Sequence, residues 1–165
     1  DIPNAEHIFP TWLAIYSSGV GAAHLPFLKT HMDRYSQSVL DTVIPGLMLP
    51  AVTLLKADQA RSMITREMNA LLQRVDVLLS PTSPIVAWPT GDVQNQGGRI
   101  SDMMAALSCC TALFNLTGHP AISVPCGLDA DGLPIGLQVT GRAYEEETVL
   151  NVAHAYESLS PLALP

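Results

Sequence analysis

The sequence predicts a fold in which several helices are combined with a small amount of β-sheet. Apolar residues recur at spacings of three and four over most of the first 74 positions, which is the helical period. A short apolar run at 76–80 is closed by Pro81, and alternating runs at 121–128 and 135–139 flank a turn. The pattern therefore predicts helices first, then a strand and a β-hairpin, with a last helix after them.

The first half of the chain is predicted to be helical in three segments. The loose pattern at 9–28 contains Gly19 and Gly21, so one or two short helices are expected there. A second helix is expected over 33–49. The clearest helix is 51–74, where apolar residues fall on one face and charged residues occupy the others. This segment is predicted to be an amphipathic packing helix with a solvated charged face.

A strand followed by a long irregular segment comes next. The run 76–80 is predicted to be a short buried strand that enters a turn at Pro81. The segment 81–98 is rich in Pro and Gly, has no regular period and is longer than most connections. A binding loop, a lid or a mobile excursion is expected. Trp88 lies within it, where its ring would either line a pocket or anchor the loop on the core.

The second half is predicted to hold a buried helix, a hairpin and a final helix. The segment 100–114 is small and apolar, so its helix should be buried on nearly all sides. In the hairpin, Pro125 and Pro134 cannot donate to a ladder and must occupy an edge, a bulge or a strand end. The helix at 145–158 opens with three glutamates, which suit a helix N-terminus. It is expected to bury Val149, Leu150, Ala153 and Tyr156.

Composition and charge limit the classes of protein that remain. The 165 residues are 48% hydrophobic and only 14% charged. Such a low charge favours a segment of a larger protein, whose remainder would cover apolar surface, over a compact and very apolar domain. The net charge is -7 and the basic residues are scattered, so nucleic acid is not expected as a partner. The apolar stretch 43–55 is broken by two prolines, so no membrane span is expected.

The start of the chain and its cysteines indicate its setting. The sequence begins at Asp1 without Met or an apolar leader, so we expect no secretory signal and a start that is not the native N-terminus. Cys109 and Cys110 are adjacent, which would strain a mutual disulfide, and Cys126 leaves an odd count. A reduced, cytoplasmic setting fits best. No zinc-ligand spacing is present, and all three cysteines are expected to be small buried side chains.

Four stretches resemble the amidase-signature family in their order and spacing. They begin at Asp76, Asn115, Gly132 and Glu145, and they are DVLLSPTSP, NLTGHPAISVPCG, GLPIGLQVTG and EEETVLNVAHAYE. The resemblance covers roughly residues 50–158 and is typical of the C-terminal portion of these enzymes. It implies an α/β fold with a mixed β-sheet covered by helices. It also implies hydrolysis of a carboxylic amide to an acid and ammonia.

The catalytic residues that this resemblance implies are not found in the chain. The family uses a serine nucleophile, activated through a second serine in a cis peptide by an uncharged lysine. Its Gly-Gly-Ser-Ser-Gly-Gly stretch is missing, and Ser17-Ser18-Gly19 lacks the preceding glycines. Lys29 and Lys56 are poor candidates for the base. The histidines, including His119 and His154, are predicted to be structural or exposed. No catalytic residue, metal ligand or cofactor is therefore assigned to this chain.

The resemblance places a candidate wall of the acyl pocket in the second half. Met104, Ser108, Thr111 and Asn115 share a helical face, with plain core packing as the alternative to substrate contact. Trp88 is the further pocket candidate. In the glutaminase subunit of the related tRNA-dependent amidotransferase, to which the chain is also similar, an acidic residue stands where Ser108 stands here. Loss of that carboxylate favours an amide with less charge, aliphatic or aryl.

Two hypotheses on the role of the chain follow. The first is a single partial domain over 1–165, with a helical lead-in at 1–50 and the family-matching core at 51–158. It would contribute scaffold and pocket wall, its partners would be a small amide substrate and the missing N-terminal half of the fold, and it would be inactive alone. The second is a non-catalytic structural or dimerisation module. In either case the apolar surface predicts that the isolated chain forms a homo-oligomer.

Overall fold

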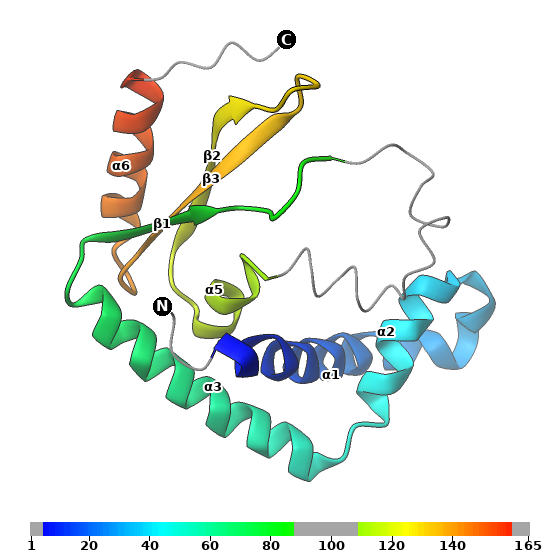
Figure 1. Ribbon diagram of the computed structural model, residues 1–165. Helices are drawn as coiled ribbons and strands as arrows, with labels where there is room; N and C mark the ends of the chain where they lie inside the picture. The colour runs from blue at the N-terminus through cyan, green and yellow to red at the C-terminus, as the bar shows by residue number, and fades with distance from the viewer. Residues whose placement is uncertain (1–4, 88–108, 160–165) are drawn as a thin grey trace. The chain divides into compact units, whose positions relative to one another are not determined.

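The computed structural model describes residues 5–87 and 109–159. Within these residues the chain divides into two compact units, split between Thr65 and Arg66, and each is described by itself. The helices are α1 (Ala5–His31), α2 (Gln37–Leu47), α3 (Ala51–Leu72), α5 (Ala112–Thr117) and α6 (Glu146–Leu159), and the strands are β1 (Val77–Pro81), β2 (Ala121–Leu128) and β3 (Pro134–Gly141) (Figure 1). The predicted combination of helices with a small sheet is confirmed.

In the first unit, α1 is one continuous helix and not the one or two short helices predicted from its glycines. Gly21 is used for packing against α2: a Cβ there would lie 3.2 Å from the Val43 carbonyl oxygen and 3.1 Å from the Leu47 side chain. Gly46 of α2 lies even closer to the backbone of α1, because a Cβ at Gly46 would collide with the Ser17 carbonyl. The glycines therefore let two helix backbones approach each other, and tertiary packing outweighs their weak helix propensity.

The predicted helix at 33–49 is shorter at its start. A single 3-10 turn, Met32–Arg34, follows α1, and Ser36 is extended before α2 begins at Gln37. The break is held by a hydrogen bond of 2.8 Å between the His24 ring nitrogen Nδ1 and the Tyr35 hydroxyl. The chain thus turns between α1 and α2 and buries Val43 completely.

Helix α3 confirms the predicted amphipathic helix. Its buried side chains recur along one face and are Ala57, Ile64, Met68 and Leu72. Lys56 is exposed on another face, as predicted. In the described residues no single helix combines the length and hydropathy needed to cross a membrane, although α2 and α3 together meet that test with a bend of 94° between them.

The second unit is built on an antiparallel sheet with the strand order β1-β3-β2. The predicted hairpin is β2 and β3, with Ile122 opposite Val139. Strand β1 pairs with the other side of β3, with Val77 opposite Gly141. All the described strand pairs are antiparallel, whereas the resemblance implied a mixed sheet. The predicted buried strand is an edge strand in the described sheet, and its Leu79 is 55% exposed.

Both prolines of the hairpin lie where the absence of a proline N–H removes no hydrogen bond between the two strands. Pro125 stands at the irregularity where β2 slips by one residue against β3, and Pro134 is the first residue of β3. The turn between the strands is held by the Asp129 carboxylate, which accepts the N–H groups of Asp131 and Leu133 at 2.9 and 2.8 Å. Gly132 has a φ of +80°, which a residue with a side chain rarely adopts. The turn chemistry therefore holds the predicted hairpin together.

Helix α6 packs on one face of the sheet through Val149, whose side chain fills the space that a Cβ on Gly141 would need. Val149 and Ala153 are buried, as predicted, but Leu150 is 57% exposed and Tyr156 is only half-buried. The expected burial of Leu150 was wrong because Leu150 is turned about 100° around the helix from Val149, away from the face that carries Val149 and Ala153. In β3, Gln138 alternates with Val139 and so points to the opposite face.

Candidate functional site

Polar side chains collect on the sheet face opposite α6. Gln138 is only 4% exposed, and its side-chain amide donates to the Ser80 hydroxyl at 3.0 Å and to the Cys110 carbonyl at 2.9 Å. On the same face, the hydroxyls of Thr82, which follows β1, and Ser123, which is on β2, are 2.6 Å apart. We call these four side chains, Ser80, Thr82, Ser123 and Gln138, the polar cluster. It joins all three strands and ties the segment that precedes α5 to the sheet.

Gly136 makes room for the polar cluster. It lies on β3 between Thr82 and Ser123, and a Cβ there would come within 2.9 Å of both hydroxyl oxygens. Thr82 also continues the ladder beyond β1, since its N–H donates to the Gly136 carbonyl at 2.9 Å. The close approach of the two hydroxyls therefore depends on a glycine at this position.

Of the predicted pocket residues, only Thr111 belongs to the described part of the chain. It precedes α5, is half-buried, and its carbonyl accepts the N–H groups of Phe114 and Asn115, both at 3.1 Å. Trp88, Met104 and Ser108 lie outside the described residues. Their convergence with Thr111 on one wall stays a prediction. Sequence reasoning missed Gln138, which neighbours Thr111 through Cys110, because an amide in an alternating strand looks like a solvent-facing residue.

An open groove of about 670 Å³ lies beside the start of β3. It is formed by Pro81 and residues 83–87 on one side and by residues 134–136 on the other. Its walls are largely apolar, and Ile85 is 54% exposed there. The described start of the irregular segment 81–98, for which a binding loop, a lid or a mobile excursion was expected, supplies one wall. The hairpin wall was not predicted.

His119 is buried at the entry to β2 and holds α3 to the α5–β2 turn. Its ring nitrogens lie 2.8 Å from the Thr117 hydroxyl and 3.1 Å from the Asn69 side-chain oxygen. Burial lowers the pKa of His119 below its ordinary value of 6.5 and so favours the neutral ring. A neutral ring donates from one nitrogen only, and the other must accept. These two side-chain partners give His119 a structural role.

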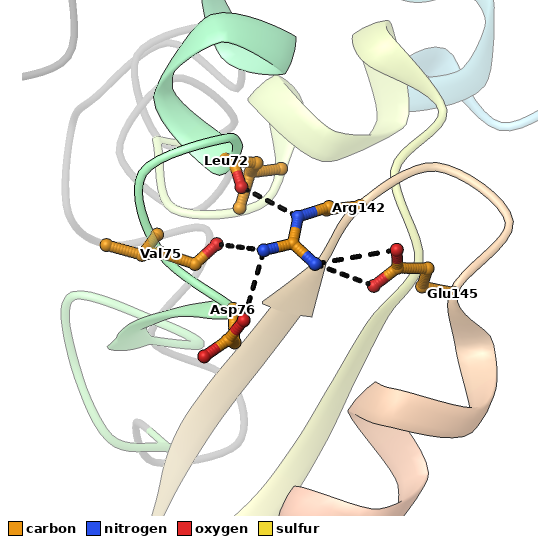
Figure 2. Close-up of polar contacts among 5 residues, drawn as sticks. All are labelled: Leu72, Val75, Asp76, Arg142 and Glu145. Atoms are coloured by element: carbon orange, nitrogen blue, oxygen red, sulfur yellow. Dashed lines mark hydrogen bonds and ion pairs between the residues drawn. The ribbon is translucent and has the colours of Figure 1, made fainter.

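Arg142 joins three segments of the second unit (Figure 2). Its guanidinium donates to the carbonyl of Leu72, the last residue of α3, at 2.8 Å and to the carbonyl of Val75, in the turn before β1, at 3.1 Å. It also pairs with Asp76 at 3.0 Å and with Glu145 at 3.2 Å. Carbonyls at a helix C-terminus lack partners within the helix, and a cation there also suits the helix dipole. Arg142 therefore connects the end of α3, the start of β1 and the start of α6.

The described side chains offer little of the chemistry that amide hydrolysis needs. Lys29 and Lys56 are both exposed, and the Ser17 hydroxyl donates to the Leu13 carbonyl at 2.7 Å within α1. Within residues 5–87 and 109–159, no three His, Cys, Asp or Glu side chains come together as a metal site would require. What the arrangement provides is a three-stranded sheet, a polar cluster that ties the entry to α5 to that sheet, and an apolar groove.

The order of the helices, the edge strand and the hairpin can now be compared with that of known proteins. The Amidase family model matches residues 31–150, so the chain belongs to the Amidase family. One subunit of the glutamyl-tRNA(Gln) amidotransferase of Brevibacillus brevis is 47% identical over 102 residues, covering 62% of this chain and 20% of that protein. The chain thus spans about a fifth of the length of the curated relatives it matches.

Solved structures show the same fold over nearly the whole chain. A crystal structure of an amidase superposes with a TM-score of 0.84 at 27% identity, covering 96% of this chain and 36% of that one. A bacterial aryl acylamidase of the amidase-signature family gives 0.78 at 25% identity, covering 99% of this chain and 36% of that one. The implied membership of the amidase-signature enzymes is confirmed.

Proposed function

We propose that this chain forms the C-terminal scaffold and one wall of the acyl pocket of an enzyme that hydrolyses a carboxylic amide to an acid and ammonia. Membership of the Amidase family and the likeness to solved amidases support amide chemistry. The observation that carries the pocket role is Gln138, which anchors the Cys110 carbonyl, next to Thr111, to the sheet. A wall that must present side chains to a substrate needs such a support.

In this proposal the serine, the cis-serine and the lysine of the reaction lie upstream, outside this chain. A lysine serves as a base only when burial or neighbouring charge keeps it neutral. Both lysines of the chain are exposed, which does not suit that role. The nucleophile and the oxyanion hole would come from the Gly/Ser-rich segment that the family uses. This chain alone is then expected to be inactive.

The proposed substrate is an amide without a free amino group, with an aliphatic or aryl acyl part. Ser108 takes the place of the acidic residue that would pair with an amino-acid substrate. The apolar character of the segment 100–114 suits an uncharged acyl group. An aryl acylamidase is among the solved relatives, which agrees with this class.

The decisive experiment measures ammonia release by three samples: this chain, a longer protein that includes an upstream Gly/Ser-rich segment, and that segment mixed with this chain. Acetamide, benzamide and glutamine serve as substrates. We expect activity in the longer protein only, with benzamide or acetamide preferred over glutamine. Ammonia release by this chain alone would contradict the upstream location of the catalytic residues.

The pocket role is tested in the longer protein by Thr111→Val, with Thr65→Val as the matched control. Thr65 is on α3, and its hydroxyl donates to the Arg61 carbonyl. Loss of one substrate hydrogen bond of about 1 kcal/mol would lower kcat/KM roughly fivefold for Thr111→Val. The control should leave it unchanged. Equal kcat/KM values for both variants would remove Thr111 from the pocket wall.

A dimerisation module is the second candidate, and the exposed apolar side chains of the first unit favour it. The most exposed are Phe27 (61%), Met48 (77%), Val52 (59%) and Leu55 (66%). Either the rest of the amidase fold or a second copy would cover such a surface. Sedimentation of the isolated chain should show self-association that Met48→Ser weakens. An inactive longer protein that still dimerises through this surface would favour this second candidate.

A further inference from the structure

Two neighbouring thiols stand at the turn before α5. The sulfur atoms of Cys109 and Cys110 are 3.6 Å apart, and both cysteines are free. Cys109 is exposed and Cys110 is half-buried. The expectation that all the cysteines are small buried side chains is therefore wrong: Cys109 is exposed, and Cys110 and Cys126 are only half-buried. Neither thiol has a part in the amide chemistry proposed above, so the pair is a feature still without a function.

A direct bond between these sulfurs is disfavoured by the backbone. Adjacent residues with a trans peptide have Cα atoms about 3.8 Å apart, which is less than the roughly 4.4 Å at the short end for disulfides. The sulfurs would also have to close from 3.6 Å to about 2.05 Å. A single atom that bonds both sulfurs requires no such closure. The geometry thus suits a bridging centre better than a disulfide.

The separation of the sulfurs limits which centre can bridge them. With metal–sulfur bonds of about 2.3 Å, a linear two-coordinate ion needs sulfurs about 4.6 Å apart. When the two bonds to sulfur meet at a right angle, the sulfurs lie about 3.3 Å apart. Tetrahedral zinc would also accept the observed 3.6 Å, but it takes four ligands. The described part of the chain brings no third His, Cys, Asp or Glu side chain into such a group. A pyramidal centre that needs only two protein sulfurs fits best.

We propose that Cys109 and Cys110 form a dithiol site for trivalent organic arsenicals. In the reaction with phenylarsine oxide, two arsenic–sulfur bonds form and the bonds from arsenic to its oxygen break. The two thiol protons leave with that oxygen as one molecule of water. Arsenic is trivalent before and after the step, so no oxidant or reductant takes part. The site does not depend on the amide chemistry of the family.

The fold fixes the backbone of this dithiol and leaves Cys109 as its accessible thiol. Gln138 donates to the Cys110 carbonyl at 2.9 Å, and Ser80 holds Gln138 in turn at 3.0 Å. The backbone of the pair is thereby fixed to the sheet. Burial first, and then the hydrogen bond to Cys109 and the charge of that neighbour, raise the pKa of the Cys110 thiol to about 11. At neutral pH Cys110 keeps its proton, and exposed Cys109 is the thiol that reacts first.

The test measures the binding of phenylarsine oxide to the full chain by intact mass and by competition with glutathione. The expected product carries one phenylarsenic group in place of two hydrogens, and it withstands the monothiol glutathione but is released by dithiothreitol. Cys109→Ser and Cys110→Ser should each weaken binding about 100-fold or more, because a chelate becomes a single bond. Cys126→Ser, the matched control, should bind like the original chain.

Two results would overturn the proposal. The first is a glutathione-resistant adduct that survives in Cys110→Ser or disappears in Cys126→Ser, since Cys126 would then be the bridging partner. The second is an unchanged affinity when the chain is unfolded in urea, because adjacency in the sequence would then suffice without the fold. Far-UV circular dichroism of each variant separates loss of the site from loss of folding.

Discussion

Replacement of Arg142 should destabilise the second unit more than any exposed ion pair would suggest. The side chain is 29% exposed and donates to two carbonyls and two carboxylates from three segments (Figure 2). A hydrogen bond from a charged donor contributes about 1.5 to 3 kcal/mol, but such contributions do not add. The Asp76 carboxylate is 86% exposed, so its part is about 1 kcal/mol or less. We therefore expect Arg142→Ala to lower the free energy of unfolding by about 3 kcal/mol.

Urea unfolding followed by far-UV circular dichroism measures this loss. For a slope near 2 kcal/mol per molar urea, the midpoint should fall by about 1.5 M. Arg142→Lys keeps the positive charge but lacks the planar guanidinium with its several N–H donors. It should therefore retain only part of the stability that Arg142→Ala loses. Arg61→Ala is the matched control, because its pair with Asp58 is 3.5 Å long and both side chains are about half exposed. Its midpoint should move by the equivalent of about 0.5 kcal/mol or less. If Arg142→Ala falls in the same small range, the guanidinium does not hold these segments together.

Two further predictions concern His119 and the glycines between α1 and α2. Because burial lowers the pKa of His119, the folded state binds fewer protons at this ring than the unfolded state, so its contribution is complete above pH 6.5 and is lost as the pH falls below it. Urea midpoints measured at pH 7.5 and 5.5 should show this loss of stability in the original chain. The loss should be as large in the control His154→Gln, which replaces an exposed histidine, and smaller in His119→Gln. An equal loss in all three proteins would contradict the prediction. Gly46→Ala should lower the free energy of unfolding by about 1–3 kcal/mol, because the added methyl group forces α1 and α2 apart. Gly19→Ala, in open space on α1, should raise it by up to about 1 kcal/mol in the same urea assay. A stabilising Gly46→Ala would disprove the close contact.

Local periodicity and turn chemistry predicted those elements whose signals lie within a few residues. The hairpin was found from alternation on both sides of Asp129–Gly132, and α3 from its apolar face. Helix α1 was misjudged at Gly21 because that glycine makes room for Val43 and Leu47, which lie more than 20 positions later in the chain. A run such as 76–80 looks the same whether it becomes a central or an edge strand, so the exposure of Leu79 could not be foreseen.

The candidate site was predicted less well than the fold. The sequence pointed to Thr111 and to the groove wall at 81–87, both of which lie near strand or helix ends. It did not point to Gln138, whose partners Ser80 and Cys110 are 58 and 28 positions away. Long-range polar contacts of this kind depend on strand order, which no local pattern encodes. Trp88, Met104 and Ser108 remain predictions.

The prolines of the outer strands determine how the described sheet could grow. Strands β1 and β2 are its two edges, and each leaves one row of backbone groups without a partner strand in the described residues. Pro81 ends β1 and Pro125 interrupts β2, and neither has an N–H to offer an incoming strand. Further strands, from an upstream part of the same fold or from a second copy, could pair continuously only along Val77–Ser80 or Ala121–Val124. The two edges thus admit short, correctly placed strands and resist indiscriminate edge-to-edge aggregation.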